Sequence, residues 1–175
     1  IVLFGSGSLA GTAADSWSDT ILGADGMIYG IPGSGTRILE LNPSTKAISF
    51  FGSFGAASNK WRSGTLADDG KIYGIPGGGA TTVLEIDTVG KSTSEFGSLA
   101  GSFQWLSCAL GLDGKIYGVP FDSTTVLEVD TALKTTSTFG SLSGSAKWLG
   151  AVLGINGKVY GIPYDSTTVL EIDPV

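Results

Sequence analysis

Few side chains in this sequence have the types that carry out catalysis. There is no histidine, and the one cysteine is Cys108. A Ser-His-Asp or Cys-His nucleophile is therefore impossible, and a zinc site would need clusters of Cys and His that are absent. The glycine-rich stretches at 5–8 and 77–79 lack the lysine and the following helix of a phosphate-binding loop. We expect no catalytic residues, no metal site and no cofactor.

The remaining chemistry would depend on carboxylates. Asp68 and Asp69 lie at a hairpin turn, where adjacent side chains point apart, and this disfavours hydrolysis by paired acids. Cys108 has no basic neighbour in the sequence that would lower its pKa, so we expect a small buried residue rather than a reactive thiol.

Aromatic residues beside acids are better candidates for a binding site. Phe121-Asp122 and Tyr164-Asp165 lie in loops that contain serine and threonine, where the first two repeats have glycines. An exposed aromatic ring next to a carboxylate suits a peptide or a sugar. Trp17, Trp61, Trp105 and Trp148 are further candidates because each ends a loop, where the indole could stack on a sugar ring. The alternative for the tryptophans, which we favour, is packing between neighbouring structural units.

Charge and hydropathy disfavour two classes of partner. The net charge is −6, and the ten Lys and Arg residues are scattered. Without a basic stripe, nucleic acid is not expected to bind. No run approaches 18 apolar residues, so we expect no membrane insertion.

The chain starts at Ile1 without Met, which suggests a processed form or a piece of a longer gene.

The sequence repeats itself four times. DGKIYGIP at 69–76 returns as DGKIYGVP at 113–120, NGKVYGIP at 156–163 and DGMIYGIP at 25–32. The tryptophans and the tyrosines of this motif recur at the same spacing of 44, 44 and 43 residues. Markers in one order at one period indicate a repeat architecture.

Each repeat predicts four short antiparallel strands. The first follows the tryptophan, as in WLSCALGLDG, and ends in an Asp-Gly or Asn-Gly hairpin turn, which we expect to be type I′. KIYGVP, TTVLEVD and TSTFG supply the other three. No segment has a helical apolar period. A period of about 44 residues with four strands is typical of a β-propeller blade.

The chain as a whole resembles β-propeller repeat proteins. The pattern DGKIYGIP…TTVLEID…FG is most similar to repeats of the streptogramin-lyase-like and kelch-like propellers. The paired Gly-Gly of kelch repeats and the catalytic histidine of the lyases are absent, so the resemblance implies a fold and no activity. We predict an all-β fold, a four-bladed β-propeller, as a single domain at 1–175. Its repeats cover about 6–52, 53–97, 98–140 and 141–175 plus 1–5.

The ends of the chain suggest how the ring closes. Residues 1–5 match a fourth strand, and 167–175 match a third strand. We therefore expect Ile1–Gly5 to pair with Thr167–Asp173 and complete the last blade, which favours a monomer. The alternative is a two-chain assembly in which four blades form half of a larger ring.

The repeated charged residues have a structural interpretation. Glu40, Glu85, Glu128 and Glu171 lie on the third strands, and Lys71, Lys115 and Lys158 open the second strands, so cross-strand pairing is expected. In the first repeat Met27 replaces the lysine, and Arg37 is the expected substitute partner of Glu40. The residues after each tryptophan are small, including Cys108 and Gly111, and are expected to face the axis or to be closely packed.

Three functions follow from these observations. The first is a non-catalytic scaffold that binds a protein or peptide through its loop face. The second is a carbohydrate-binding, lectin-like propeller. The third is a hydrolase or lyase with a carboxylate site, for which Asp122 and Asp165 would be the candidates.

Overall fold

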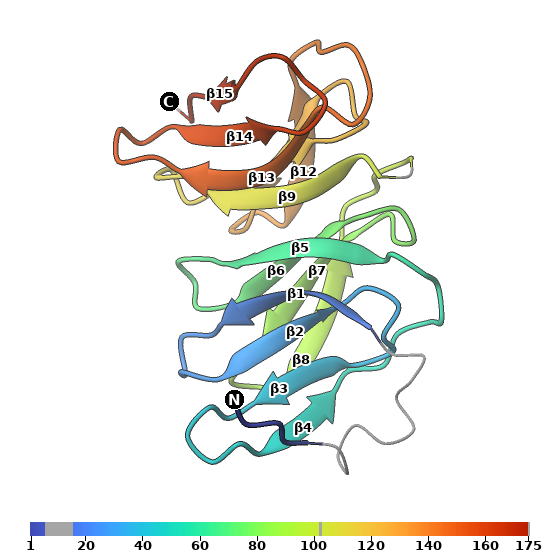
Figure 1. The fold of residues 1–175 in the computed structure, drawn as a ribbon, viewed down its shortest axis with the longest axis vertical. Coiled ribbons are helices and arrows are strands. Elements are labelled where there is room, and N and C mark those ends of the chain that lie inside the picture. Colours follow the sequence, from blue (N-terminus) through green and yellow to red (C-terminus); the bar gives the residue numbers. More distant parts are fainter. Residues whose placement is uncertain (6–15, 102, 175) are drawn as a thin grey trace.

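The protein is built of short antiparallel strands, as the repeats predict. The computed structural model describes residues 1–5, 16–101 and 103–174, and within them no helix occurs, so none could cross a membrane. The strands form four separate sheets, one for each repeat (Figure 1). We call these sheets blades 1 to 4.

The strands of each blade follow one another along the chain and pair with their sequence neighbours. Blade 1 consists of β1 (Trp17–Leu22), β2 (Ile28–Pro32), β3 (Ile38–Leu41) and β4 (Ile48–Phe51). Blade 2 consists of β5 (Trp61–Leu66), β6 (Ile72–Pro76), β7 (Val83–Asp87) and β8 (Ser92–Phe96). Blade 3 consists of β9 (Trp105–Leu110), β10 (Ile116–Pro120), β11 (Val126–Asp130) and β12 (Thr135–Phe139). Blade 4 consists of β13 (Trp148–Leu153), β14 (Val159–Pro163) and β15 (Leu170–Ile172).

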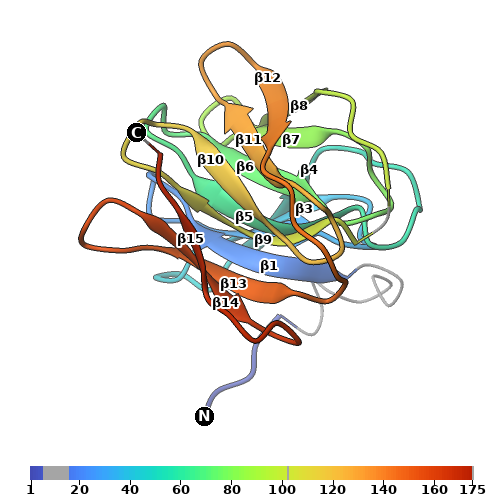
Figure 2. The ribbon, with the colours of Figure 1, turned by 90° about the horizontal axis from the view of Figure 1, so that it is seen from above.

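The first strands of the four blades lie side by side. β5 contacts β1 and β9, and β9 also contacts β13. Blades therefore follow in chain order along the longest axis of the molecule, from blade 1 to blade 4 (Figure 1). The view along that axis shows the blades splayed around the first strands (Figure 2). This arrangement is that of successive propeller blades.

Three apolar cores hold the blades together, one between each neighbouring pair. The core between blades 2 and 3 is typical: Tyr73, Ile75 and Val83 of blade 2 pack on the face of blade 3 that carries Trp105 and Ile116. The other two interfaces contain the corresponding residues. Burial of these alternating strand residues is the main stabilising contribution in this fold.

The small residues after the tryptophans are closely packed, as expected. A Cβ on Gly111 would lie 2.8 Å from Cε2 of the Tyr117 ring, and Gly154 has the same relation to Tyr160. Cys108 lies opposite Gly118 in the β9–β10 pair. In blades 1, 3 and 4 the tyrosine ring of the repeat motif thus covers a glycine directly after the first strand, where a Cβ would clash. Blade 2 has Ala67 at this position.

The predicted completion of blade 4 by the N-terminal residues is not found. The fourth sheet has three strands, and Ile1–Gly5 forms none. The two termini lie at opposite ends of the row of blades (Figure 1). Phe4 instead lies near blade 1, with its ring 5.9 Å from Nζ of Lys46. The physical reason is that two strands, β5 and β9, stand between β1 and β13 (Figure 1).

The Asp-Gly hairpins differ from the predicted type I′ turn. Only the glycine has a positive φ, 78° at Gly70, and Gly70 N–H donates to Ala67 O at 3.0 Å. The aspartate instead accepts hydrogen bonds through its side chain. Asp69 Oδ1 accepts the Lys71 N–H at 3.1 Å, and Oδ2 accepts the Tyr73 hydroxyl at 2.7 Å. A type I′ turn requires positive φ at both central residues, and this loop does not have it.

The expected cross-strand pairs form in blades 2, 3 and 4. Lys71 contacts Glu85, Lys115 contacts Glu128 at 3.0 Å, and Lys158 contacts Glu171 at 2.6 Å. Blade 1 differs from the prediction. Lys91 of blade 2 lies 2.7 Å from Glu40, whereas the Arg37 guanidinium lies over the Phe50 ring. The sequence position of Lys91 gave no sign of this contact, because it is made between blades.

Candidate functional site

Two sets of loops come together on one face of the molecule. The loops between blades contact the loops that join second and third strands. Lys147 N–H donates to Phe121 O at 3.0 Å, and Asp165 N–H donates to Ala146 O at 2.9 Å. We call the surface formed by these loops the loop face. Its backbone hydrogen bonds fix the loops on which the predicted candidates lie.

Phe121 and Tyr164 meet on the loop face although they belong to neighbouring blades. Their ring centroids are 5.7 Å apart and the rings are tilted by 52°. Phe121 is half-buried, and the Tyr164 side chain is 60% exposed. A supported but exposed ring of this kind has the properties of an interface anchor.

The two aspartates next to these rings have different surroundings. Asp122 Oδ1 accepts the Ala146 N–H at 2.8 Å and so holds the loop between blades 3 and 4. Asp165 is exposed, and it lines a hollow in blade 4. Asp165 is therefore the more accessible of the two carboxylates, whereas Asp122 maintains the loop conformation.

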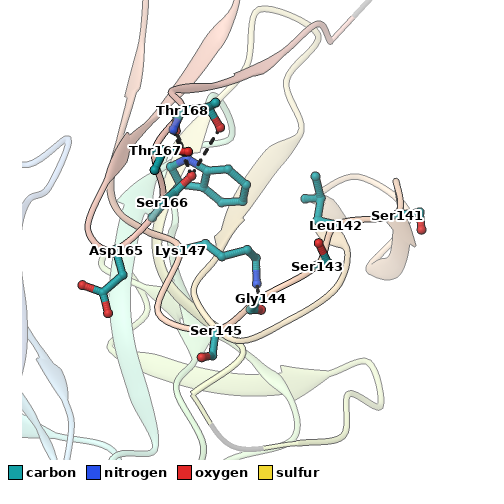
Figure 3. Close-up of a pocket in the computed structure, with 11 residues that line it drawn as sticks. Ser141, Leu142, Ser143, Gly144, Ser145, Lys147, Asp165, Ser166, Thr167 and Thr168 are labelled. Carbon is teal, nitrogen blue, oxygen red and sulfur yellow. Dashed lines mark hydrogen bonds between the residues drawn. The ribbon is translucent and has the colours of Figure 1, made fainter.

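This hollow has a volume of about 460 Å³ (Figure 3). Besides Asp165, it is lined by the indole of Trp148, the side chain of Lys147 and a set of hydroxyl-bearing residues: Ser141, Ser143, Ser145, Ser166, Thr167 and Thr168. Its wall consequently offers many hydrogen-bond donors and acceptors. Smaller hollows lie at the corresponding places in blades 3 and 2, with volumes of about 380 and 310 Å³.

Lys147 is a residue of the loop face that the sequence analysis did not single out. It is 4% exposed, and its Nζ donates to Gly144 O at 2.8 Å and to Phe121 O at 3.0 Å. Burial lowers the pKa of Lys147. The signal in the sequence is the lysine directly before the tryptophan, which also occurs as Lys60 in blade 2.

The tryptophans lie mainly between the blades. Trp61, Trp105 and Trp148 are 2–5% exposed and belong to the apolar cores. Their indole N–H groups donate to backbone carbonyls, as Trp105 Nε1 does to Thr125 O at 2.9 Å. Trp17 is half-buried and donates to Arg37 O at 3.0 Å. The four indoles therefore do not form an exposed ring of stacking platforms.

Cys108 lies inside the interface between blades 2 and 3. Its Sγ is 3.6 Å from the Ser63 hydroxyl, and burial raises the pKa of the thiol to about 12. We expect no reaction with a thiol reagent such as DTNB in the native protein at mildly alkaline pH, and full reaction in denaturant. Rapid labelling of the native protein would contradict this buried position. Within the described ranges, the acids and the cysteine form no cluster of three or more metal ligands.

No family model matches the chain, and no curated protein sequence matches it. Solved structures share its fold. The structure of a streptogramin B lyase has 16% identity and a TM-score of 0.71, covering 91% of this chain and 55% of the lyase. The hydrazine synthase of Kuenenia stuttgartiensis has 15% identity and a TM-score of 0.71, covering 94% and 49%.

A third similar structure is an auxiliary nutrient binding protein from Bacteroides ovatus, with 10% identity and a TM-score of 0.66, covering 90% of this chain and 39% of the other. The chain thus spans about half the length of the lyase and synthase chains. Together with the four sheets, these similarities define the protein as an all-β propeller-repeat protein.

Proposed function

We propose that this protein is a non-catalytic binding module that takes a protein or peptide partner on its loop face, at Phe121 and Tyr164. The observation that carries the proposal is the contact between these rings across two blades, with Tyr164 60% exposed. An aromatic side chain held in place by a neighbour loses little entropy when a partner packs on it.

Charge adds a preference among peptide partners. Asp165 stands exposed beside Tyr164, and the protein carries a net charge of −6. Lys147, which contacts Phe121, donates the hydrogen bonds of its Nζ to backbone carbonyls. The site would therefore favour a segment in which an apolar or aromatic side chain is next to a lysine or arginine.

Carbohydrate is the second candidate ligand. The observation that favours it is the hollow of about 460 Å³ next to Asp165, which is lined by serine and threonine hydroxyls. A sugar could place its hydroxyl groups against this wall and one ring face on Tyr164. The similarity to a nutrient-binding protein supports binding in general but shows only the fold.

The absence of catalysis is part of the proposal. The sequence contains no histidine, and its one thiol is buried with a raised pKa. A hydrolase or lyase would depend on Asp122 and Asp165. Turnover of any substrate that is lost on replacing both aspartates would contradict the proposal.

The test uses Tyr164→Ala as a selective variant. Peptides would be selected from a displayed random library on the wild-type protein, and the same protein would be probed on a glycan array. We expect selected peptides to lose at least about 10-fold in affinity for Tyr164→Ala. Leu112→Ala, an exposed apolar residue at a hairpin turn on the opposite face, should bind them unchanged. Glycan binding lost in Tyr164→Ala would favour the second candidate, and binding insensitive to Tyr164 would overturn the site.

A further inference from the structure

The three interfaces between blades repeat one pattern, and this pattern leaves two faces uncovered. In each interface a tyrosine face packs on a tryptophan face. The tyrosine face of blade 3 consists of Tyr117, Val119 and Val126, and it covers the face of blade 4 that carries Trp148 and Val159. The chain of four blades therefore ends in one tryptophan face, on blade 1, and one tyrosine face, on blade 4.

The tyrosine face of blade 4 is exposed. Ile162 is 50% exposed, whereas the corresponding Val119 of blade 3 is 0% exposed. Val169 is 57% exposed, whereas the corresponding Val126 is 3% exposed. Ile162 and Val169 are therefore apolar, like the interface residues to which they correspond, but no other blade in the described part of the chain covers them. Contiguous exposed apolar residues of this kind mark an interaction surface.

The tryptophan face of blade 1 is also less covered than its counterparts. Trp17, Ile28 and Leu39 are half-buried. The corresponding residues of blade 2, Trp61, Ile72 and Leu84, are 0–2% exposed. Blade 1 thus presents the surface that would fit the tyrosine face of blade 4, in the same way as the internal interfaces.

At two of the internal interfaces, a lysine of one blade contacts a glutamate and a tyrosine of the preceding blade. Lys134 of blade 3 reaches blade 2, where it lies 2.5 Å from Glu85 and also contacts the Tyr73 hydroxyl. Lys91 of blade 2 makes the same contacts with Glu40 and Tyr29 of blade 1. Both lysines occupy the turn between third and fourth strands with positive φ.

Lys46 occupies the same turn in blade 1, also with positive φ. Its counterparts reach the preceding blade, and the described chain has no blade before blade 1. The groups that would accept hydrogen bonds from Lys46 are on blade 4, the Tyr160 hydroxyl oxygen and the Glu171 carboxylate. The Tyr160 hydroxyl itself donates to Glu171 at 2.8 Å, and Glu171 is exposed. Lys46 therefore has the position and charge to complete this pair across a new interface.

We infer that blade 4 of one copy packs on blade 1 of a second copy, and that two chains close a ring of eight blades. Such a joint is head-to-tail and occurs twice in the ring, so no uncovered face is left. The comparison agrees with a ring of more than four blades, because this chain matches only 55% of the streptogramin B lyase chain. Lys46 of each copy would contact Tyr160 and Glu171 of the other.

The first measurement is the solution mass by light scattering over a dilution series. We expect twice the 17.8 kDa of one chain, with dissociation on dilution. Ile162→Asp and Val169→Asp each place a charge in the joint at a residue exposed in the single chain, so both should fold. Each should weaken association by at least about 100-fold. The matched control is Val89→Asp, an 88% exposed apolar residue in the β7–β8 turn, which should leave association unchanged.

The lysine contact has its own test. Lys46→Ala and Glu171→Gln should each weaken association by about 5-fold, and the double variant should be no weaker than either single one. Additive losses would overturn the contact. A single-chain mass at all concentrations would overturn the two-chain ring and leave the two faces to further blades of a longer chain. Species larger than two copies would overturn closure by two chains.

Discussion

Replacing Trp105 with alanine should lower the free energy of unfolding by about 3–5 kcal/mol. The indole is 4% exposed and lies in the core between blades 2 and 3, beside Cys108, Ile75 and Val83. The variant removes apolar contacts from both blades and leaves the Thr125 carbonyl without the indole donor. The substitution leaves a cavity in place of the indole. Because the neighbouring blades limit how far the surrounding strands can move, most of this cavity should remain.

Urea denaturation followed by circular dichroism would measure this loss. Tyr164→Ala is the control, because it removes an aromatic ring that is 60% exposed and should change stability by no more than about 0.5 kcal/mol. A Trp105→Ala loss as small as that of the control would place the indole outside the core and would return Trp105 to the candidates for ligand stacking.

The packing of Trp105 between blades and the strands of each repeat could be predicted, because both follow from patterns that recur within one repeat. The four strands per repeat follow from the period of 44 residues, the alternation of KIYGVP and the glycine-containing turns. These features act within one blade or between neighbouring blades. The structure places the first two strands at the same positions in each repeat, for example β6 at Ile72–Pro76 and β10 at Ile116–Pro120.

Closure of the ring could not be predicted in the same way. The residues at 1–5 match a fourth strand, but a match does not say which blade the strand would complete. Every interface between blades has nearly the same residues, so the sequence of one interface is compatible with rings of different size. The angle between successive blades decides the outcome, and this angle depends on packing over the whole interface.

On the loop face, too, some features could be predicted from the sequence and others could not. The exposed aromatic residues Phe121 and Tyr164 could be found because they stand among small polar residues in loops. Their contact could not, since it depends on how loops of two blades meet. The burial of Lys147 could not be predicted either, because lysines are rarely buried. Its partners are backbone carbonyls, which leave no pattern in the sequence.

The second large effect is expected at Glu85, where two cations from different blades meet. Glu85 is 8% exposed, pairs with Lys71 of its own blade and lies 2.5 Å from Lys134 of blade 3. Replacing Glu85 with glutamine should destabilise the protein by about 2–3 kcal/mol at about pH 7, because two lysines lose their shared anion. The loss is smaller than for a fully buried pair, since both lysines are about a third exposed.

The pH dependence of this loss distinguishes charge from shape. Burial pushes the pKa of Glu85 upward, but the hydrogen bonds from Lys134 and Lys71 outweigh it and hold the pKa below its usual value of 4.5. A carboxylate with a lowered pKa in the folded state stabilises the protein above its unfolded pKa, and this contribution disappears as the pH falls through the folded pKa. The stability difference between wild type and Glu85→Gln should therefore be greatest near neutral pH and shrink in acid.

Urea denaturation of both proteins at about pH 7 and about pH 3 would measure this difference. Glu171→Gln is the matched control, because Glu171 occupies the same strand position in blade 4 but is exposed. It should change the stability of the single chain much less, so the measurement is made at a dilution where association does not contribute. A Glu85→Gln loss that is equal at both pH values would mean that the carboxylate acts through packing. The pairing of Lys71 and Lys134 on one anion would then contribute nothing to holding blades 2 and 3 together.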